Sequence, residues 1–413
     1  MIHDEVGQFR DAYADRFAAG MSEYVNRYGR KFLLLLEGAL KRKRSVIYLF
    51  GNGGSHAIGQ CLKYALEAYA AKYGLSVRIQ SGVDVHQVLG GSEDDPGLSF
   101  TQILRTEGAD QGDLVVLISG SGDSDNLCTT ARYTQEQQIP TLALLGSYHG
   151  KINDVLPAEH CFVTPFHDQQ LSEDIIQSLV YSFDLLTKVG RDESWPEVVS
   201  KHAENLRQAI RRIPADFLAR TAQHIVDAFE AGRMIWVLGL EHPALSATAE
   251  HTAHNLYWDS IYEVLKPPPR LISSSPTACN FSGISNDRRR GILQNLIGIP
   301  EIQGGGFGLF YTIGSDSSIC EELLSQWERY DKPISIFSAT GSEVFTQENW
   351  TTYSTGLHDP QMQAGISQIF GHMLGRLVRL RLLERERPQN VQLRAEPAQF
   401  LIDFDLAQRR LLE

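Results

Sequence analysis

Cysteine, positive charge and long apolar runs are all scarce in this 413-residue sequence. Its five cysteines are scattered and form no CxxC pair, which argues against a disulfide framework or a zinc ribbon and predicts free thiols in a reducing compartment. No apolar run reaches the roughly 18 residues that a membrane-spanning helix needs. The amino terminus also lacks the basic-then-apolar order of a signal peptide. We therefore expect a cytoplasmic protein without a membrane partner.

Basic residues are outnumbered by acidic ones, 38 against 50, so the formal net charge is −12. The dense basic runs, KRKR at 41–44 and RRR at 288–290, are short and are expected to be solvated. A chain with this charge is a poor nucleic-acid binder, and we expect no nucleic-acid partner. A phosphorylated ligand would have to be held by local groups against an unfavourable overall field.

Three apolar segments, each leading into a turn, occur twice along the chain. They are Ser45–Phe50, Asp113–Gly120 and Thr141–Gly146 in the first half, and Met234–Leu240, Gly308–Gly314 and Ile334–Ala339 in the second. Near-continuous apolar runs are typical of buried parallel strands. From Gly51 to Ser121 there are 70 residues, and from Gly239 to Ser315 there are 76. This self-similarity predicts a duplicated domain.

The segments around the strands have a helical pattern. Helices are expected at about 7–40 and 197–231, and each half closes with a long amphipathic segment, at 173–189 and 361–383. The predicted fold class is α/β, with two tandem domains that are each a doubly wound parallel sheet flanked by helices in three layers. We place the domains at 1–193 and 194–413, because the charged, proline-containing segment GRDESWPE interrupts the pattern there.

The turns after the first two strands carry the residues that suggest a ligand. GNGGS at 51–55 contains Asn52, Gly53 and Ser55, and SGSGDSDN at 119–126 contains Ser119, Ser121 and Ser124. Glycines let backbone N–H groups converge, the following helix adds the positive end of its dipole, and hydroxyls can donate to a phosphate dianion. Turn geometry explains one glycine-rich loop, and helix capping explains one serine but not three. The two turns at neighbouring carboxyl ends of strands therefore predict a phosphate site.

GNGGS, SGSGDS and a DxxQ pattern on the last long helix resemble the SIS (sugar isomerase) domain, and within it the phosphoheptose isomerases. The resemblance covers Val46–Val189, and Trp236–Leu382 is similar to a diverged copy. It implies that Asp95, Asp174 and Gln177 meet the sugar, together with the residues of the two turns. It also implies a homo-oligomer, a dimer of pseudo-dimers.

The acid/base and metal positions depart from this pattern. Where the family has His, Glu, Gln and His, the first half has Cys61, Ala65, Gln177 and Leu185. In the second half, His251 and His372 fall on the two histidine positions and Asn255 on that of the glutamate. By resemblance, His251 and His372 are the candidate catalytic groups and the candidate ligands of a divalent metal such as zinc, although ordinary hydrogen-bonded helix histidines explain the same pattern.

For two further side chains the sequence predicts only a position. His242 is expected at the surface, and Glu173 in a loop that could close over a substrate, with no specific signal for either.

Two classes of function remain open. The first is a ketose/aldose isomerase of a phosphorylated sugar, such as sedoheptulose 7-phosphate or a related long-chain ketose phosphate, acting by proton transfer through an enediol(ate); the two halves could then divide phosphate binding and proton transfer. The second is a catalytically silent sugar-phosphate-binding regulator or scaffold, which the lost acid/base residues favour. A tandem isomerase linked to an amidotransferase is the weaker third, because no glutaminase-like segment precedes Ser45.

Overall fold

The computed structural model describes residues 3–42, 44–81, 100–146, 150–166, 168–189, 195–240, 242–256, 271–273, 306–313, 333–339, 350–386 and 401. They form two compact units. The amino-terminal unit is Arg16–Asn205, and the carboxy-terminal unit combines Leu206–Glu413 with Met1–Asp15. The predicted division at residues 193 and 194 concerns the extent of two domain copies and stays a prediction. Among the described helices, none combines the length and apolarity that crossing a membrane requires.

The amino-terminal unit is built on a five-stranded parallel sheet in the order β2-β1-β3-β4-β5. The strands are β1 Val46–Gly51, β2 Arg78–Ser81, β3 Leu114–Ser119, β4 Thr141–Leu145 and β5 Cys161–Val163. β1, β3 and β4 confirm the predicted strands. β3 and β4 are buried at every residue, because helices cover both faces of the sheet.

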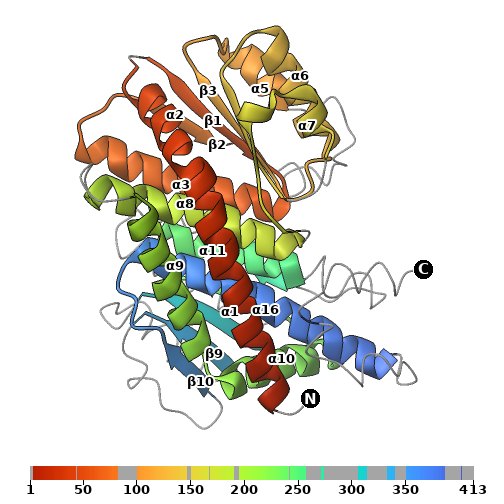
Figure 1. The fold of residues 1–413 in the computed structure, drawn as a ribbon. Coiled ribbons are helices and arrows are strands. Elements are labelled where there is room, and N and C mark those ends of the chain that lie inside the picture. Colours follow the sequence, from red (N-terminus) through yellow and green to blue (C-terminus); the bar gives the residue numbers. More distant parts are fainter. Residues whose placement is uncertain are drawn as a thin grey trace, which may run out of the picture. The chain divides into compact units, whose positions relative to one another are not determined.

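Helices on the two faces of this sheet follow from the crossovers between its strands (Figure 1). α3 (Gly53–Lys72) packs against α8 (Gln169–Val189) on one face, while α5 (Phe100–Glu107), α6 (Asp125–Glu136) and α7 (Ile152–Val155) lie on the other. A short 3-10 turn, Ala158–His160, precedes β5. The face towards α5 and α6 holds an apolar cluster that includes Tyr48, Phe50 and Phe100, with the last two rings stacked.

A near-continuous helical segment precedes this sheet and confirms the prediction for residues 7–40. It consists of α1 (His3–Tyr24), a π-helical turn at Val25–Gly29, and α2 (Arg30–Leu40). α2 presents Phe32, Leu36 and Leu40 to the interior, at the spacing of one helical face.

The carboxy-terminal unit repeats the same strand order. Its sheet, β10-β9-β8-β6-β7, is parallel throughout and reads β7-β6-β8-β9-β10 from the other edge, which matches the amino-terminal sheet strand for strand. The strands are β6 Ile235–Gly239, β7 Leu271–Ser273, β8 Phe307–Thr312, β9 Ile334–Ser338 and β10 Trp350–Ser354. β6, β8 and β9 confirm the predicted strands, and the shared order supports the duplication.

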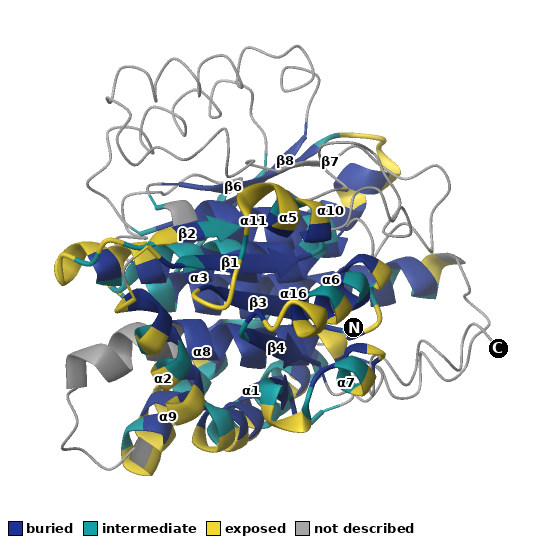
Figure 2. Ribbon diagram, turned by 90° about the horizontal axis from the view of Figure 1, so that it is seen from above, coloured by how far each residue is buried: buried dark blue, intermediate teal, exposed yellow. Residues whose placement is uncertain are grey.

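The described helices of this unit are α10 (Ala215–Glu230), α11 (Pro243–Asn255) and α16 (Pro360–Glu386), together with α1 up to Asp15 and α9 (Trp195–Arg212) from Leu206 onward. α11 contacts β6 and α16, as α3 contacts β1 and α8. α10 also packs on α16 and on the sheet. In both units the central strands are buried, and exposed residues are concentrated on the outer sides of the helices (Figure 2).

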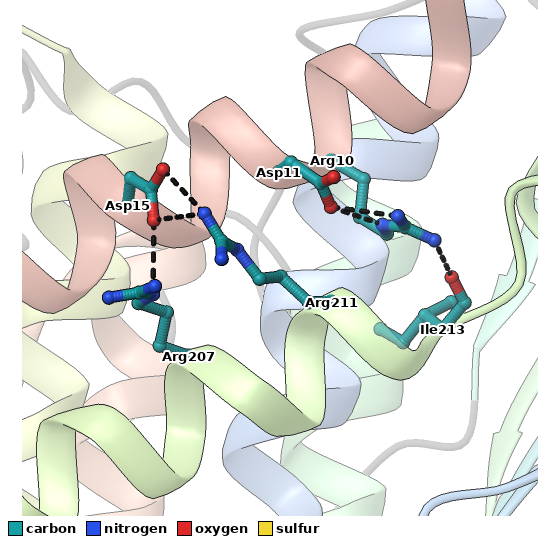
Figure 3. Close-up of polar contacts among 6 residues, drawn as sticks. All are labelled: Arg10, Asp11, Asp15, Arg207, Arg211 and Ile213. Carbon is teal, nitrogen blue, oxygen red and sulfur yellow. Dashed lines mark hydrogen bonds and ion pairs between the residues drawn. The ribbon is translucent and has the colours of Figure 1, made fainter. Parts of the chain in front are cut away.

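Charged side chains hold the first turns of α1 to the α9–α10 segment within the carboxy-terminal unit (Figure 3). Asp15 accepts two 2.7 Å hydrogen bonds from Arg211 and forms a 3.1 Å ion pair with Arg207. Arg10 pairs with Asp11 at 2.8 Å and donates to the carbonyl oxygen of Ile213 at 2.7 Å. Asp15 is the shared acceptor of two guanidinium groups, so its charge is the centre of this network.

Replacing Asp15 by asparagine tests the network. We expect Asp15→Asn to lower the free energy of unfolding by about 0.5–1 kcal/mol at low salt, because the pairs are half-exposed. The loss should shrink in about 1 M salt, where exposed charges are screened. Chemical denaturation measures both values. Asp216→Asn, which removes one exposed helical pair with Arg220, is the matched control; equal losses in the two variants would contradict a special role for Asp15.

Candidate functional site

The switch point of the amino-terminal sheet lies between β1 and β3, which pair in parallel from Ile47 opposite Leu114 to Gly51 opposite Ile118. In a doubly wound sheet of this strand order, ligands bind beyond the carboxyl ends of these two strands. The two polar turns predicted from the sequence follow β1 and β3 directly. The fold therefore brings both turns to the position where such sheets bind ligands.

Two sets of hydrogen bonds join the turns across the switch point. The side-chain amides of Asn52 and Asn126 bond reciprocally, each NH₂ donating to the other oxygen at 3.0 Å. The hydroxyl oxygen of Ser55 accepts from the backbone N–H of Gly120 at 3.3 Å. Asn126 also accepts from the N–H of Leu127 at 2.8 Å, so its amide orientation is fixed. These bonds hold the starts of α3 and α6 in one arrangement.

The serines of the second turn differ in their bonding. Ser119 accepts from the N–H of Gly122 at 2.9 Å, and Ser121 accepts from that of Asp123 at 3.2 Å. Ser124 is the N-cap residue of α6, but its side chain makes no capping bond to a described residue. Each hydroxyl that accepts a bond still has one hydrogen to donate. The three serines can therefore all donate towards a ligand.

The start of α3 also has donors that can bond to a ligand. Its N-cap is Asn52, whose side chain makes no capping bond among the described residues because it is paired with Asn126. Gly53, the first helical residue, has a φ of 50°, which a residue with a side chain rarely adopts. The first N–H groups of α3 and α6 are the orphan donors that commonly bind anions.

Carboxylates near the serine turn are partly neutralised by Lys151. Its ammonium group bonds to Asp125 at 3.1 Å, and its backbone N–H donates to Asp123 at 3.0 Å. The hydrogen bond to Asp125 raises the pKa of Lys151. The segment carrying Lys151 also docks on the turn, since the N–H of Ile152 donates to the carbonyl oxygen of Gly122 at 3.1 Å. Lys151 thus offsets the acidic residues that begin α6.

α8 carries the two residues that the DxxQ resemblance selected. Asp174 is 2% exposed and Gln177 is 1% exposed. The preceding residue, Glu173, is also buried and lies in the helix rather than in a loop, which corrects the expectation from the sequence. Asp95 lies outside the described residues.

The family's first acid/base positions are occupied by residues that suit packing. Cys61 and Ala65 face the interior from α3, at 1% and 5% exposure. A buried thiol in apolar surroundings behaves as a small hydrophobe. Neither residue offers a proton-transfer group to the switch point.

The corresponding turn of the carboxy-terminal unit is built differently. His242 is the N-cap residue of α11, and its Nδ1 accepts from the N–H of Ala244 at 3.1 Å. This residue is partly buried, so the expected surface position is wrong. The imidazole of His242 therefore accepts a hydrogen bond from a backbone N–H group at the start of α11. At the start of α3, the side chain of the N-cap residue makes no such bond. Residues 314–332, which include Ser315, lie outside the described residues.

His251 on α11 and His372 on α16 are brought into contact. Their Nε2 atoms are 3.2 Å apart, the rings meet edge to face, and the side chains are 2% and 0% exposed. The helices approach closely beside them, because a Cβ on Gly371 would lie 2.3 Å from Oγ1 of Thr252. Thr252 also bonds to the hydroxyl of Tyr311 at 3.0 Å, and burial raises the pKa of that phenol well above its usual value.

This pair fits two kinds of chemistry. If one Nε2 carries a hydrogen, the rings share it, and the pair can accept or deliver a proton. If neither does, both nitrogens can bind one ion. Two imidazole ligands of a tetrahedral zinc ion, with Zn–N bonds of about 2.0–2.1 Å, have their nitrogens about 3.3 Å apart. The observed separation agrees with that spacing.

Comparisons with known proteins agree with the fold and with the first turns. Residues 31–146 match the family model described as the SIS domain. This match lies within the amino-terminal unit and runs from α2 to the end of β4. This part of the chain is thus similar to the SIS domain.

One relative makes the match more particular. The phosphoheptose isomerase of a Nitratiruptor species is 32% identical over 122 residues, which are 29% of this chain and 64% of that protein. The chain therefore matches less than two thirds of the length of this curated relative.

Solved structures resemble nearly the whole chain in fold. The C-terminal domain of glucosamine-fructose-6-phosphate aminotransferase from Francisella tularensis has a TM-score of 0.57 at 14% identity, covering 92% of this chain and 95% of that one. Tagatose-6-phosphate ketose/aldose isomerase from Escherichia coli has a TM-score of 0.57 at 12% identity, covering 91% of each chain. At these identities the likeness concerns the fold.

The histidine cap of α11 predicts a dependence of stability on pH. Burial lowers the pKa of His242, although Asp359 opposes the shift. The folded pKa lies below the unfolded value of about 6.5, so the contribution of neutral His242 is present above that pH and is lost as the pH falls. His242→Ser keeps a capping side chain that does not titrate. We expect the stability of the wild type relative to this variant to fall by about 1 kcal/mol between about pH 7.5 and about pH 5, measured by urea unfolding. An unchanged difference would show that the cap does not titrate.

Proposed function

We propose that the protein binds a phosphorylated sugar at the β1/β3 switch point of the amino-terminal unit and isomerises it between ketose and aldose. The observation that carries the proposal is the pair of links, Asn52 with Asn126 and Ser55 with Gly120, that fixes two donor-rich turns against each other. A sugar phosphate suits this arrangement because one end is a dianion and the rest is a chain of hydroxyls. The matched phosphoheptose isomerase supports sedoheptulose 7-phosphate or a related long-chain ketose phosphate as the substrate.

Neutral donors would hold the phosphate. The hydroxyls of Ser119, Ser121 and Ser124, with the first N–H groups of α3 and α6, can each donate to a non-bridging oxygen. Ser55 and the Asn52 amide would orient the turn or meet sugar oxygens nearby. This binding needs no arginine or lysine, which fits a chain whose net charge is −12.

Isomerisation needs groups that move a proton between adjacent carbons and stabilise the enediol(ate). His251 and His372 are the proposed groups of the carboxy-terminal unit, as proton carriers or as two ligands of a divalent metal such as zinc. Their 3.2 Å Nε2 separation supports both roles. A bound metal ion would polarise the oxygens of the carbonyl and the neighbouring hydroxyl.

A silent sugar-phosphate-binding regulator or scaffold is the second candidate. The observation that favours it is the packing of Cys61 and Ala65, which leaves the amino-terminal unit without the family's first acid/base residues. Such a protein would keep the phosphate turn and lose turnover.

Removing the hydroxyl of Ser124 tests the phosphate site without disturbing α6, because that hydroxyl makes no capping bond to a described residue. We expect Ser124→Ala to weaken binding of sedoheptulose 7-phosphate and of inorganic phosphate by at least about tenfold, since a hydrogen bond to a charged group is worth about 1.5–3 kcal/mol. Phosphorus NMR titration measures both. Thr129→Ala, on the exposed side of the same helix, is the control. Equal affinities for Ser124→Ala and wild type would place the phosphate elsewhere.

Solvent exchange separates the two functions and tests the histidines. The protein is incubated in deuterated water with ketose phosphates of six to eight carbons, with and without zinc, and deuterium at the carbons beside the carbonyl is followed by NMR. We expect exchange with appearance of aldose in the wild type, and a loss of about 100-fold or more in the His251→Gln/His372→Gln double variant. His254→Gln on the same helix is the control.

Each outcome of this assay has a meaning. Binding without exchange in the wild type would favour the regulator or scaffold. Exchange that survives in the double variant would exclude the two histidines from turnover.

A further inference from the structure

The first turns of α8 bury several polar side chains. Gln170, Glu173, Asp174 and Gln177 are all at most 5% exposed. Burying a carboxylate is costly unless it is compensated. Buried ionisable groups also occur at functional sites, which directs attention to what α8 approaches.

α8 approaches the second turn of the phosphate site at Gly120. A Cβ built on Gly120 would lie 2.9 Å from Cγ of Gln169 and 3.1 Å from Oε1 of Glu173. The carboxylate of Glu173 thus lies against the backbone of Gly120, whose N–H donates to Ser55. A side chain at position 120 would require Gln169, and to a smaller extent Glu173, to shift, so the glycine allows α8 to approach the turn this closely.

Gln177 continues the same face of the helix. It follows Glu173 by four residues, about 6 Å further along α8. Neither its amide oxygen nor its NH₂ group has a hydrogen-bond partner among the described residues, although the side chain is 1% exposed. A buried amide without a partner in the protein fits a hydrogen-bonding ligand.

The geometry points to Glu173 as the proton-transferring carboxylate of the amino-terminal unit, with Gln177 as a hydrogen-bonding partner of the sugar oxygens. This inference rests on the proposed isomerase function and adds a base where Cys61 and Ala65 supply none. The phosphate turn would anchor one end of the ligand, and Glu173 and Gln177 would face the carbons and oxygens beyond it.

The step is balanced without a further reagent. The Glu173 carboxylate removes a proton from the hydroxyl-bearing carbon beside the ketone, the C–H electron pair becomes the C=C bond, and the carbonyl π pair moves onto its oxygen. The hydrogen of the neighbouring hydroxyl passes to that oxygen, and the carboxylic acid returns its proton to the former carbonyl carbon. The ketose becomes an aldose, and Glu173 ends as a carboxylate.

The full-length protein carrying Glu173→Gln tests this role, because the amide has the same shape and cannot take the proton. The assays are deuterium exchange into the ketose phosphates, affinity for sedoheptulose 7-phosphate and for inorganic phosphate, and a thermal melt. Glu136→Gln, at an exposed position on α6, is the matched control. We expect Glu173→Gln to lose at least about 100-fold in exchange rate and to keep both affinities within about threefold, with a cooperative melt that shows the variant is folded. Glu173→Asp should retain part of the exchange, with the rising limb of the pH profile that a carboxylate base gives.

The other results overturn the inference in distinguishable ways. Exchange at the wild-type rate in Glu173→Gln, with the wild type active, removes Glu173 and leaves the isomerase proposal standing. Loss of binding together with exchange, or of the folded state, makes Glu173 a structural or ligand-holding residue. Binding without exchange in the wild type overturns the isomerase proposal and this inference together.

Discussion

The reciprocal amide pair between Asn52 and Asn126 is the contact on which the arrangement of the proposed site depends. Asn52 is the N-cap residue of α3, and Asn126 is the second residue of α6, so each lies at the start of a helix that follows a central strand. Because their amides bond to each other, α3 keeps its first N–H groups, and the two turns are held in register. The Ser55 bond to Gly120 reinforces this link from the other side of the turn.

The two units differ in the turn and helix that follow their central strands β1 and β6. In the amino-terminal unit, the turn after β1 leaves donors available, and the buried face of α3 carries Cys61 and Ala65. In the carboxy-terminal unit, His242 caps the start of α11, and the buried face of that helix carries His251. The predicted duplication would permit this, because each feature would need to be kept in only one of the two copies.

The central strands could be predicted from the sequence and the outer ones could not. β1, β3, β4, β6, β8 and β9 are near-continuous apolar runs because helices and neighbouring strands bury them. β2, β5, β7 and β10 are the edges of the two sheets, with three to five residues each. β2 and β10 include polar residues such as Arg78 and Thr352, and their strand conformation is set by pairing with a neighbour.

The candidate site likewise has residues that could be predicted from the sequence and residues that could not. The serine turns were predictable because residue type and position after a strand define them. Asn126 and Glu173 were not, since their roles arise from approaches between segments distant in sequence. For Glu173 the signal is Gly120, whose missing side chain is visible in the sequence but whose neighbour is known only from the fold. The contact of His251 with His372, 121 residues apart, likewise depends on the packing of α11 on α16.

A turn that offers hydroxyl and peptide N–H donors instead of cationic side chains has a consequence for how the ligand is selected. Attraction between full charges is long-ranged and weakens as the ionic strength rises, whereas hydrogen bonds from neutral groups act only at contact. Recognition at the serine turn would therefore depend on the shape of the phosphate and not on its charge at a distance. Polyanions, which collect on basic surfaces, would find little to hold them here.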